Sequence, residues 1–142
     1  MPEACVFCDI VARKHEASIV YEDDDVVAFL DTRPVNTGHT LVVPRRHAAN
    51  LAELDPEDGA RIFQVAMVVA AALRKSGVRC EGINFRINDG VAAGQRVFHV
   101  HLHVMPRFEG DILSLRSLDL GPPPSRDNLN QVAQLVRDIL DA

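Results

Sequence analysis

The chain has 142 residues, which is enough for one domain with a hydrophobic core and too few for two. Apolar residues make up 47% of it and charged residues 25%, and its net charge of −5 argues against a broad nucleic-acid-binding face, which must be basic. The longest apolar run, residues 65–73, is far shorter than the roughly 20 residues that cross a membrane. The first residues lack the basic and apolar regions of a secretory signal, so we expect a cytoplasmic protein without nucleic-acid or membrane partners.

The first third of the sequence alternates short apolar runs with turn residues, a pattern typical of strands. In chain order we expect a short helix at residues 5–13, a hairpin at 18–31, a loop at 32–38 and a strand at 39–44. The hairpin prediction depends on two β-branched runs that flank the acidic turn Asp23 to Asp25. Pro34 and Gly38 interrupt the loop.

The long helix is the clearest element of the sequence. Asp55 is a suitable N-cap, Pro56 fits the first helical position, and Gly77 is a suitable residue just beyond the end. After it we expect a strand at residues 83–88, a glycine-rich loop at 89–95, a strand at 96–105 and a last helix at 129–140. Strands that follow one another through short turns predict an α+β fold, with helices packed on an antiparallel sheet of about five strands.

Three histidines, His99, His101 and His103, occupy every second position of one predicted strand. Side chains at this spacing share one face, so the three imidazoles face the same way and the intervening apolar residues face the core. Three interpretations remain open: solvated histidines without chemistry, a metal site, or a nucleophilic imidazole that attacks phosphorus. For the last, the glycine-rich loop just before the strand is placed to hold phosphoryl oxygens with its backbone N–H groups.

The sequence around these histidines resembles the histidine triad (HIT) superfamily of nucleotide hydrolases and transferases, including its Hint-like and Fhit-like members. "HVHLHVM" at residues 99–105 matches the triad, "VVAFLDTRPVNTGHTLVVPRRH" at 26–47 is similar to the strand–loop–strand of that family, and "INDGVAAGQ" at 87–95 is similar to its phosphate loop. The resemblance implies a HIT domain over residues 1–111, a C-terminal extension over 112–142 with a Pro-rich spacer and a terminal helix, and a two-fold homodimer.

The resemblance also implies a role for each matching residue. His101 would attack the α-phosphorus of a purine nucleotide, with an AMP or GMP moiety, and form a nucleotidyl–histidine intermediate. His103 and His39 would complete the catalytic cluster, and Asp31 would accept hydrogen bonds from the ribose hydroxyls. The phosphate pocket would be lined by Asn88, Gly94 and Gln95. The expected activity is hydrolysis of a nucleoside 5′-phosphoramidate or of a dinucleoside polyphosphate.

Arg96 departs from the family pattern, because the residue after Gly-Gln is usually Ser or Thr there. A guanidinium at this position can pair with a phosphate of the substrate or point into solvent. The substitution favours dinucleoside polyphosphates over phosphoramidates as the expected substrates.

Cys5 and Cys8 have the spacing of a zinc knuckle, although spacing alone equally fits two ordinary reduced cysteines on a helix. The resemblance implies two further ligands, His47 and His99, because some bacterial members bind structural zinc with a Cys, Cys, His, His set. No organic cofactor is expected. A second class of function remains open beside the enzyme. In it the protein is a zinc-containing nucleotide-binding module that acts as a sensor or scaffold and has little turnover.

Overall fold

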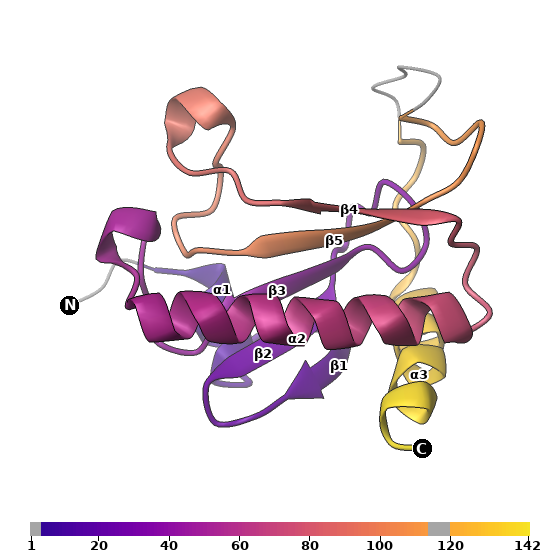
Figure 1. Cartoon of the computed structure of the whole chain (residues 1–142), viewed down its shortest axis with the longest axis horizontal. Coiled ribbons are helices and arrows are strands. Elements are labelled where there is room, and N and C mark those ends of the chain that lie inside the picture. Colours follow the sequence, from indigo (N-terminus) through magenta and orange to yellow (C-terminus); the bar gives the residue numbers. More distant parts are fainter. Residues whose placement is uncertain (1–3, 114–119) are drawn as a thin grey trace.

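The computed structural model describes residues 4–113 and 120–142, and its centre is one antiparallel five-stranded sheet (Figure 1). The strands are β1 (Ile19–Glu22), β2 (Val26–Leu30), β3 (Thr40–Pro44), β4 (Gly82–Arg86) and β5 (Leu102–Arg107). Their order across the sheet is β1-β2-β3-β5-β4, and every neighbouring pair is antiparallel. The α+β fold with five strands is therefore confirmed.

The long helix α2 (Pro56–Lys75) lies across one face of the sheet (Figure 1). Asp55 caps its first turn by accepting a hydrogen bond from the backbone N–H of Glu57, and Pro56 follows as the first helical residue, as predicted. Beyond the C-cap Ser76, Gly77 has a φ of +88°, a conformation that favours glycine. The buried side chains of the helix are Ile62, Val65, Ala66, Val69, Ala70, Ala72 and Leu73.

The terminal helix α3 (Arg126–Leu140) packs beside α2 and against β1, as the right side of Figure 1 shows. Its apolar residues Leu129, Val132, Ala133 and Val136 are buried in the same core as α2. Arg137 donates a hydrogen bond to the carbonyl of Ile19 at 2.6 Å. The helical part of the C-terminal extension thus packs onto the sheet, whereas residues 114–119 of that extension lie outside the described part.

The short helix α1 (Val6–Val11) packs on the opposite face of the sheet. Phe7 and Ile10 of α1 pack on the strand residues Val27, Phe29, Leu41 and Val43. This arrangement makes a second, smaller apolar cluster on that face. No helix of the described residues is long and apolar enough to span a membrane.

Two strand predictions differ from the structure at their ends. The predicted histidine strand at residues 96–105 is β5 at Leu102–Arg107, so His99 and His101 precede the strand, and the chain bends at residues 97–99. This segment pairs with the loop after β3 instead, since the N–H of Val100 donates to the carbonyl of Ala48 at 2.8 Å. The predicted strand at 83–88 is β4, which begins at Gly82 and ends at Arg86.

Candidate functional site

The three triad histidines share the face of the sheet that carries α1. Val100, Leu102 and Val104 point the other way into the α2-side core, so the predicted alternation extends beyond the strand itself. The rings of His101 and His103 lie 5.0 Å apart, centroid to centroid. Phe7 of α1 stands edge-on to His101 at 5.1 Å. The helix therefore forms one wall beside the imidazoles.

His39 and His103 form a hydrogen-bonded pair that selects one tautomer in each ring. The N–H of Val35 donates to Nδ1 of His39 at 3.1 Å, so the proton of the neutral His39 ring is on Nε2. That Nε2–H lies 2.9 Å from Nδ1 of His103 and donates to it. His103 then carries its own proton on Nε2. Oδ2 of Asp31 lies 3.6 Å from the same Nε2, which is too far for a hydrogen bond, so the carboxylate acts on the pair through its charge. The ligand atoms of Asp31, His39 and His103 are close enough to hold a metal ion, but the two nitrogens that face each other are engaged in the hydrogen bond between the rings.

His101 has the opposite tautomer. Its Nδ1 lies 2.8 Å from the carbonyl oxygen of His99, which can only accept a hydrogen bond. The ring proton is therefore on Nδ1, and Nε2 keeps its lone pair. A neutral imidazole with one nitrogen held by a backbone acceptor and the other unprotonated has the form of a nucleophile.

Burial keeps these imidazoles neutral. Desolvation lowers the pKa of His39 to about 4, although the nearby Asp31 carboxylate opposes the shift. Desolvation lowers the pKa of His103 to about 3, and the charges of His39, His101 and Arg86 add to that effect. The pKa of His101 is also lowered, again mainly by burial. At neutral pH the cluster has uncharged rings with fixed proton positions.

A cavity of about 290 Å³ opens in front of His101 and His103. Asp31 lies at its edge, and its walls are largely apolar. The apolar side chains that line it include Phe7, Ile10, Phe29, Leu41 and Val97. An apolar pocket with a few convergent polar groups at one side is typical of a small-molecule site, and here it suits a flat ring system beside a ribose and a phosphate.

The glycine-rich loop is braced from inside by Gln95. Its Oε1 accepts a hydrogen bond from the N–H of Gly90 at 2.8 Å, and its Nε2 donates to the carbonyls of Ala49 and Val97 at 2.6 and 3.0 Å. Gln95 is 5% exposed, so its amide shapes the loop and does not project from it. Gly94, with a φ of +93°, lies against the side chain of Asn88.

Arg96 is exposed and lies apart from the cavity that holds the histidines. It lines a neighbouring hollow of about 500 Å³ together with Cys5 and His47. The structure thus brings Asp31, His39, His101 and His103 together, and it places Arg96 beside the hollow that Cys5 and His47 line.

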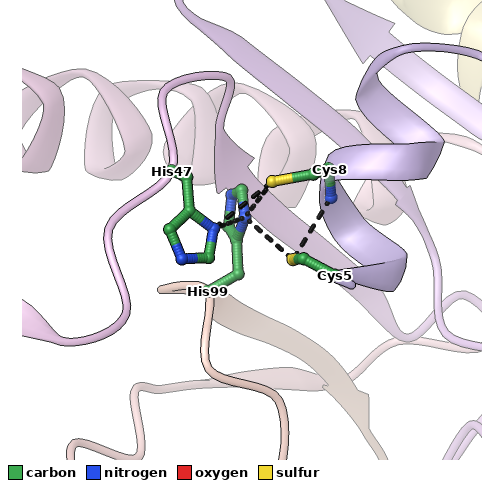
Figure 2. Close-up of side chains that lie close together, drawn as sticks. All are labelled: Cys5, Cys8, His47 and His99. Atoms are coloured by element: carbon green, nitrogen blue, oxygen red, sulfur yellow. Dashed lines mark hydrogen bonds between the residues drawn. The ribbon is translucent and has the colours of Figure 1, made fainter. Parts of the chain in front are cut away.

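The second cluster consists of Cys5 and Cys8 from the start of α1, His47 from the loop after β3, and His99 (Figure 2). Their ligand atoms all lie within 4.8 Å of one another. Nδ1 of His99 lies 3.5 Å from Sγ of Cys5, 3.5 Å from Sγ of Cys8 and 3.2 Å from Nδ1 of His47. Sγ of Cys8 lies 3.3 Å from Nδ1 of His47.

These separations fit a tetrahedral zinc ion. Zn–N bonds of about 2.05 Å and Zn–S bonds of about 2.3 Å give ligand-to-ligand edges of about 3.3 to 3.8 Å in a regular tetrahedron. Nε2 of His99 lies 2.8 Å from the carbonyl oxygen of Pro44 and donates to it, so Nδ1 carries the lone pair that a metal needs. Burial raises the pKa of Cys8 to about 11, and the neighbouring Cys5 adds to the shift. A cation between the sulfurs would favour the thiolate that this environment otherwise opposes.

Sequence reasoning missed two groups that define the site. Phe7, which walls the cavity, sits between the two cysteines, and its helical spacing to the buried Ile10 is a signal that could have placed it. The N–H of Val35, which sets the tautomer of His39, belongs to the backbone and has no sequence signature.

Comparison with known proteins places this site in a family. The HIT domain matches residues 12–110, and the chain belongs to the HIT family, as its motifs predicted. An uncharacterised HIT-like protein of Mycobacterium tuberculosis (strain H37Rv) is 41% identical over 129 residues, which cover 90% of this chain and 89% of that one.

Two solved structures are similar over nearly the whole chain. A zinc-bound histidine triad family protein from Mycobacterium smegmatis superposes with a TM-score of 0.84 at 40% identity, covering 97% of this chain and 94% of that one. A hypothetical histidine triad nucleotide-binding protein from Sulfolobus tokodaii gives a TM-score of 0.85 at 32% identity, covering 96% of this chain and 92% of that one.

Proposed function

We propose that the protein is a nucleotide hydrolase or nucleotidyl transferase that cleaves its substrate at the α-phosphate through a covalent nucleotidyl–histidine intermediate. The observation that carries this proposal is the tautomer of His101. Its Nδ1–H is held by the carbonyl of His99 at 2.8 Å, and the unprotonated Nε2 belongs to a ring that lines the cavity. The relationship to a nucleotide-binding HIT protein supports a nucleotide as the ligand.

In the proposed first step, Nε2 of His101 forms a bond to the α-phosphorus while the bond from phosphorus to the leaving group breaks. The electron pair of that bond goes to the leaving atom. The Nε2–H of His103 points away from His39 and donates a hydrogen bond to the phosphoryl group or the leaving atom, and the leaving group takes its proton from solvent. In the second step, the oxygen of water forms a bond to the phosphorus while the bond from phosphorus to Nε2 of His101 breaks and its electron pair returns to Nε2. The proton of the water goes to solvent, and a nucleoside monophosphate is released.

The proposed substrate is a purine nucleotide with an AMP or GMP moiety. The base lies among the apolar walls of the cavity, and Asp31 accepts hydrogen bonds from the ribose hydroxyls. The glycine-rich loop holds the phosphate with backbone N–H groups, and Asn88 and Gly94 line that side. Gln95 acts by keeping the loop in shape, and Arg96 contacts the substrate only beyond the loop.

We propose that Cys5, Cys8, His47 and His99 hold a structural zinc ion. The tetrahedral separations and the lone pair on Nδ1 of His99 support this assignment, and the zinc-bound relative from Mycobacterium smegmatis supports it further. When bound, zinc supplies a crosslink between α1, the loop after β3 and the segment before β5. Residues 1–111 would then form the HIT domain, and residues 112–142 an extension of it.

The decisive test compares the wild-type protein with His101→Ala on two substrates, adenosine phosphoramidate and diadenosine tetraphosphate, and measures AMP release. We expect the wild type to turn over at least one of them and the variant to be about a thousandfold slower or more, because the nucleophile is gone. The variant should still bind AMP, as isothermal titration calorimetry would show. If the wild type binds AMP and cleaves neither substrate, the protein is a nucleotide-binding module instead.

A further inference from the structure

A row of directly paired residues crosses the histidine face of the sheet from β2 to β4. Phe29 pairs with Leu41, Leu41 pairs with His103, and His103 pairs with Arg86. Paired residues in antiparallel strands point to the same face, and neighbouring strands lie about 4.8 Å apart. Arg86 is therefore the side chain next to His103, on the side away from Phe29.

The two ends of this row differ in chemistry. Phe29 and Leu41 line the apolar cavity, where Asp31 also lies, and His103 lines its inner edge. Arg86 is not among the lining residues and follows His103 on the edge strand β4. A nucleotide whose base and ribose occupy the cavity, with its α-phosphate at the histidines, thus has Arg86 beyond that phosphate.

Arg86 is exposed, and its charge is not neutralised by a neighbour. Other arginines of the chain bind carboxylates closely, such as Arg107, which contacts Asp111 at 2.6 Å, and Arg61, which contacts Asp23 at 2.5 Å. Within residues 4–113 and 120–142, the side chain of Arg86 has neither an ion pair nor a hydrogen bond.

The orientation of β4 confirms where Arg86 points. Its neighbour Phe85 contacts Phe63 of α2, with ring centroids 6.0 Å apart on the opposite face of the sheet. The positive charge of Arg86 also contributes to the lowered pKa of both His39 and His103, which places it within electrostatic reach of the catalytic rings.

We propose that Arg86 binds the leaving group, and that the preferred substrates are those whose leaving group is an anionic phosphate chain rather than a neutral amine. This inference rests on the proposed function. When the bond from the α-phosphorus to the bridging oxygen breaks, the electron pair stays on that oxygen and negative charge grows on the departing phosphate chain. A guanidinium beside His103 stabilises this charge, and an amine that departs neutral gains nothing from it.

The experiment measures kcat/KM for diadenosine tetraphosphate and for adenosine phosphoramidate in the wild type and in Arg86→Gln, and takes the ratio of the two values. We expect the ratio to fall about tenfold or more in Arg86→Gln and to recover in part in Arg86→Lys, which keeps the charge without the planar fork. Arg74→Gln is the matched control. It removes the same charge from an exposed position on α2, across the sheet, and should leave the ratio unchanged.

The outcomes separate this inference from the function on which it rests. An unchanged ratio in Arg86→Gln, whether both substrates are slowed equally or neither is, would overturn the role of Arg86. Cleavage of the phosphoramidate alone by the wild type would overturn the preference for anionic leaving groups and leave histidine catalysis intact. Cleavage of neither substrate would overturn both.

Discussion

His101 donates a hydrogen bond from Nδ1 to the carbonyl oxygen of His99, at 2.8 Å, while the ring of His99 donates from Nε2 to the carbonyl of Pro44, also at 2.8 Å. Two histidines separated by one residue thus have opposite tautomers. His99 presents Nδ1 to the cysteines, and His101 retains Nε2 for the cavity. His99 consequently belongs to both sites. Its side chain is part of the candidate metal site, and its backbone carbonyl fixes the ring of the proposed nucleophile, His101.

The first prediction is that metal removal lowers both stability and activity. A ligand present at about 1,000 times its Kd stabilises a protein by about 4 kcal/mol, and each kcal/mol shifts Tm by about 3 °C at this chain length, so we expect EDTA to lower Tm by on the order of 10 °C. Turnover should fall with it, because the carbonyl of His99 loses its anchor. Elemental analysis should find about one zinc per chain.

A matched pair of cysteine variants tests the same prediction. Cys8→Ala removes a proposed ligand and should abolish both the bound metal and the response of Tm to EDTA. Cys80→Ala removes a free cysteine outside the cluster and should leave the metal content unchanged. Equal metal content in the two variants would contradict the proposed zinc site.

The second prediction concerns the His39–His103 pair. His39→Ala removes the donor that holds Nδ1 of His103 at 2.9 Å, so the proton of His103 is no longer confined to Nε2. We expect kcat to fall about 10- to 100-fold and KM to change little, because the pair positions a proton rather than the nucleotide. His39→Gln retains an N–H donor and should recover part of the loss. A wild-type kcat in His39→Ala would show that this tautomer is not needed.

The third prediction concerns pH. Burial lowers the pKa of His39 to about 4 and that of His103 to about 3, so both stay neutral well below their ordinary value near 6.5. We expect kcat to be nearly constant from pH 7 to about pH 5 and to fall below that. A loss of kcat centred near pH 6.5 would contradict it, provided that circular dichroism shows the protein folded throughout.

The same shifts have a consequence for stability. Because the folded-state pKa of each histidine is lower than that of the unfolded chain, the unfolded state binds more protons between about pH 6.5 and pH 4. The contribution of His39 and His103 to the free energy of unfolding is therefore highest above pH 6.5 and decreases as the pH falls through this window. The free energy of unfolding, measured by urea titration at pH 7 and at pH 5, should differ less between the two pH values in His39→Ala than in the wild type.

Local sequence signals predicted most of the fold and the common face of the triad. The long helix followed from Asp55, Pro56 and Gly77, which act within a few residues of where they stand. The alternation of His99, His101 and His103 also held, although His99 and His101 precede β5, because Val100 and Leu102 between them are buried in the core.

What the sequence could not supply depends on distant partners. The tautomers follow from the carbonyl of Pro44 and the N–H of Val35, which only the fold brings to the rings. The amide of Gln95 is turned into its own loop, although the motif suggested a phosphate contact. Arg86 escaped notice because its place beside His103 is set by the register between β4 and β5.

The last prediction is a homodimer built on the edge strand β4 and the exposed side of α2. Phe63, Met67 and Phe85 are 51%, 56% and 41% exposed, and Phe63 contacts Phe85, so they form one apolar patch beside β4, the last strand of the sheet among the described residues. An antiparallel pair of two β4 strands is self-complementary, as a two-fold axis requires, and would cover both the edge and the patch.

We expect light scattering after size exclusion to give twice the chain mass of 15.6 kDa. Met67→Glu places a charge in the centre of the patch, and its partner copy places a second one near it, so this variant should be a monomer. Leu135→Glu is the matched control, because Leu135 is 47% exposed on α3, away from the patch. A wild-type monomer at micromolar concentration would rule the dimer out. A Met67→Glu variant that remains dimeric would move the interface to another face.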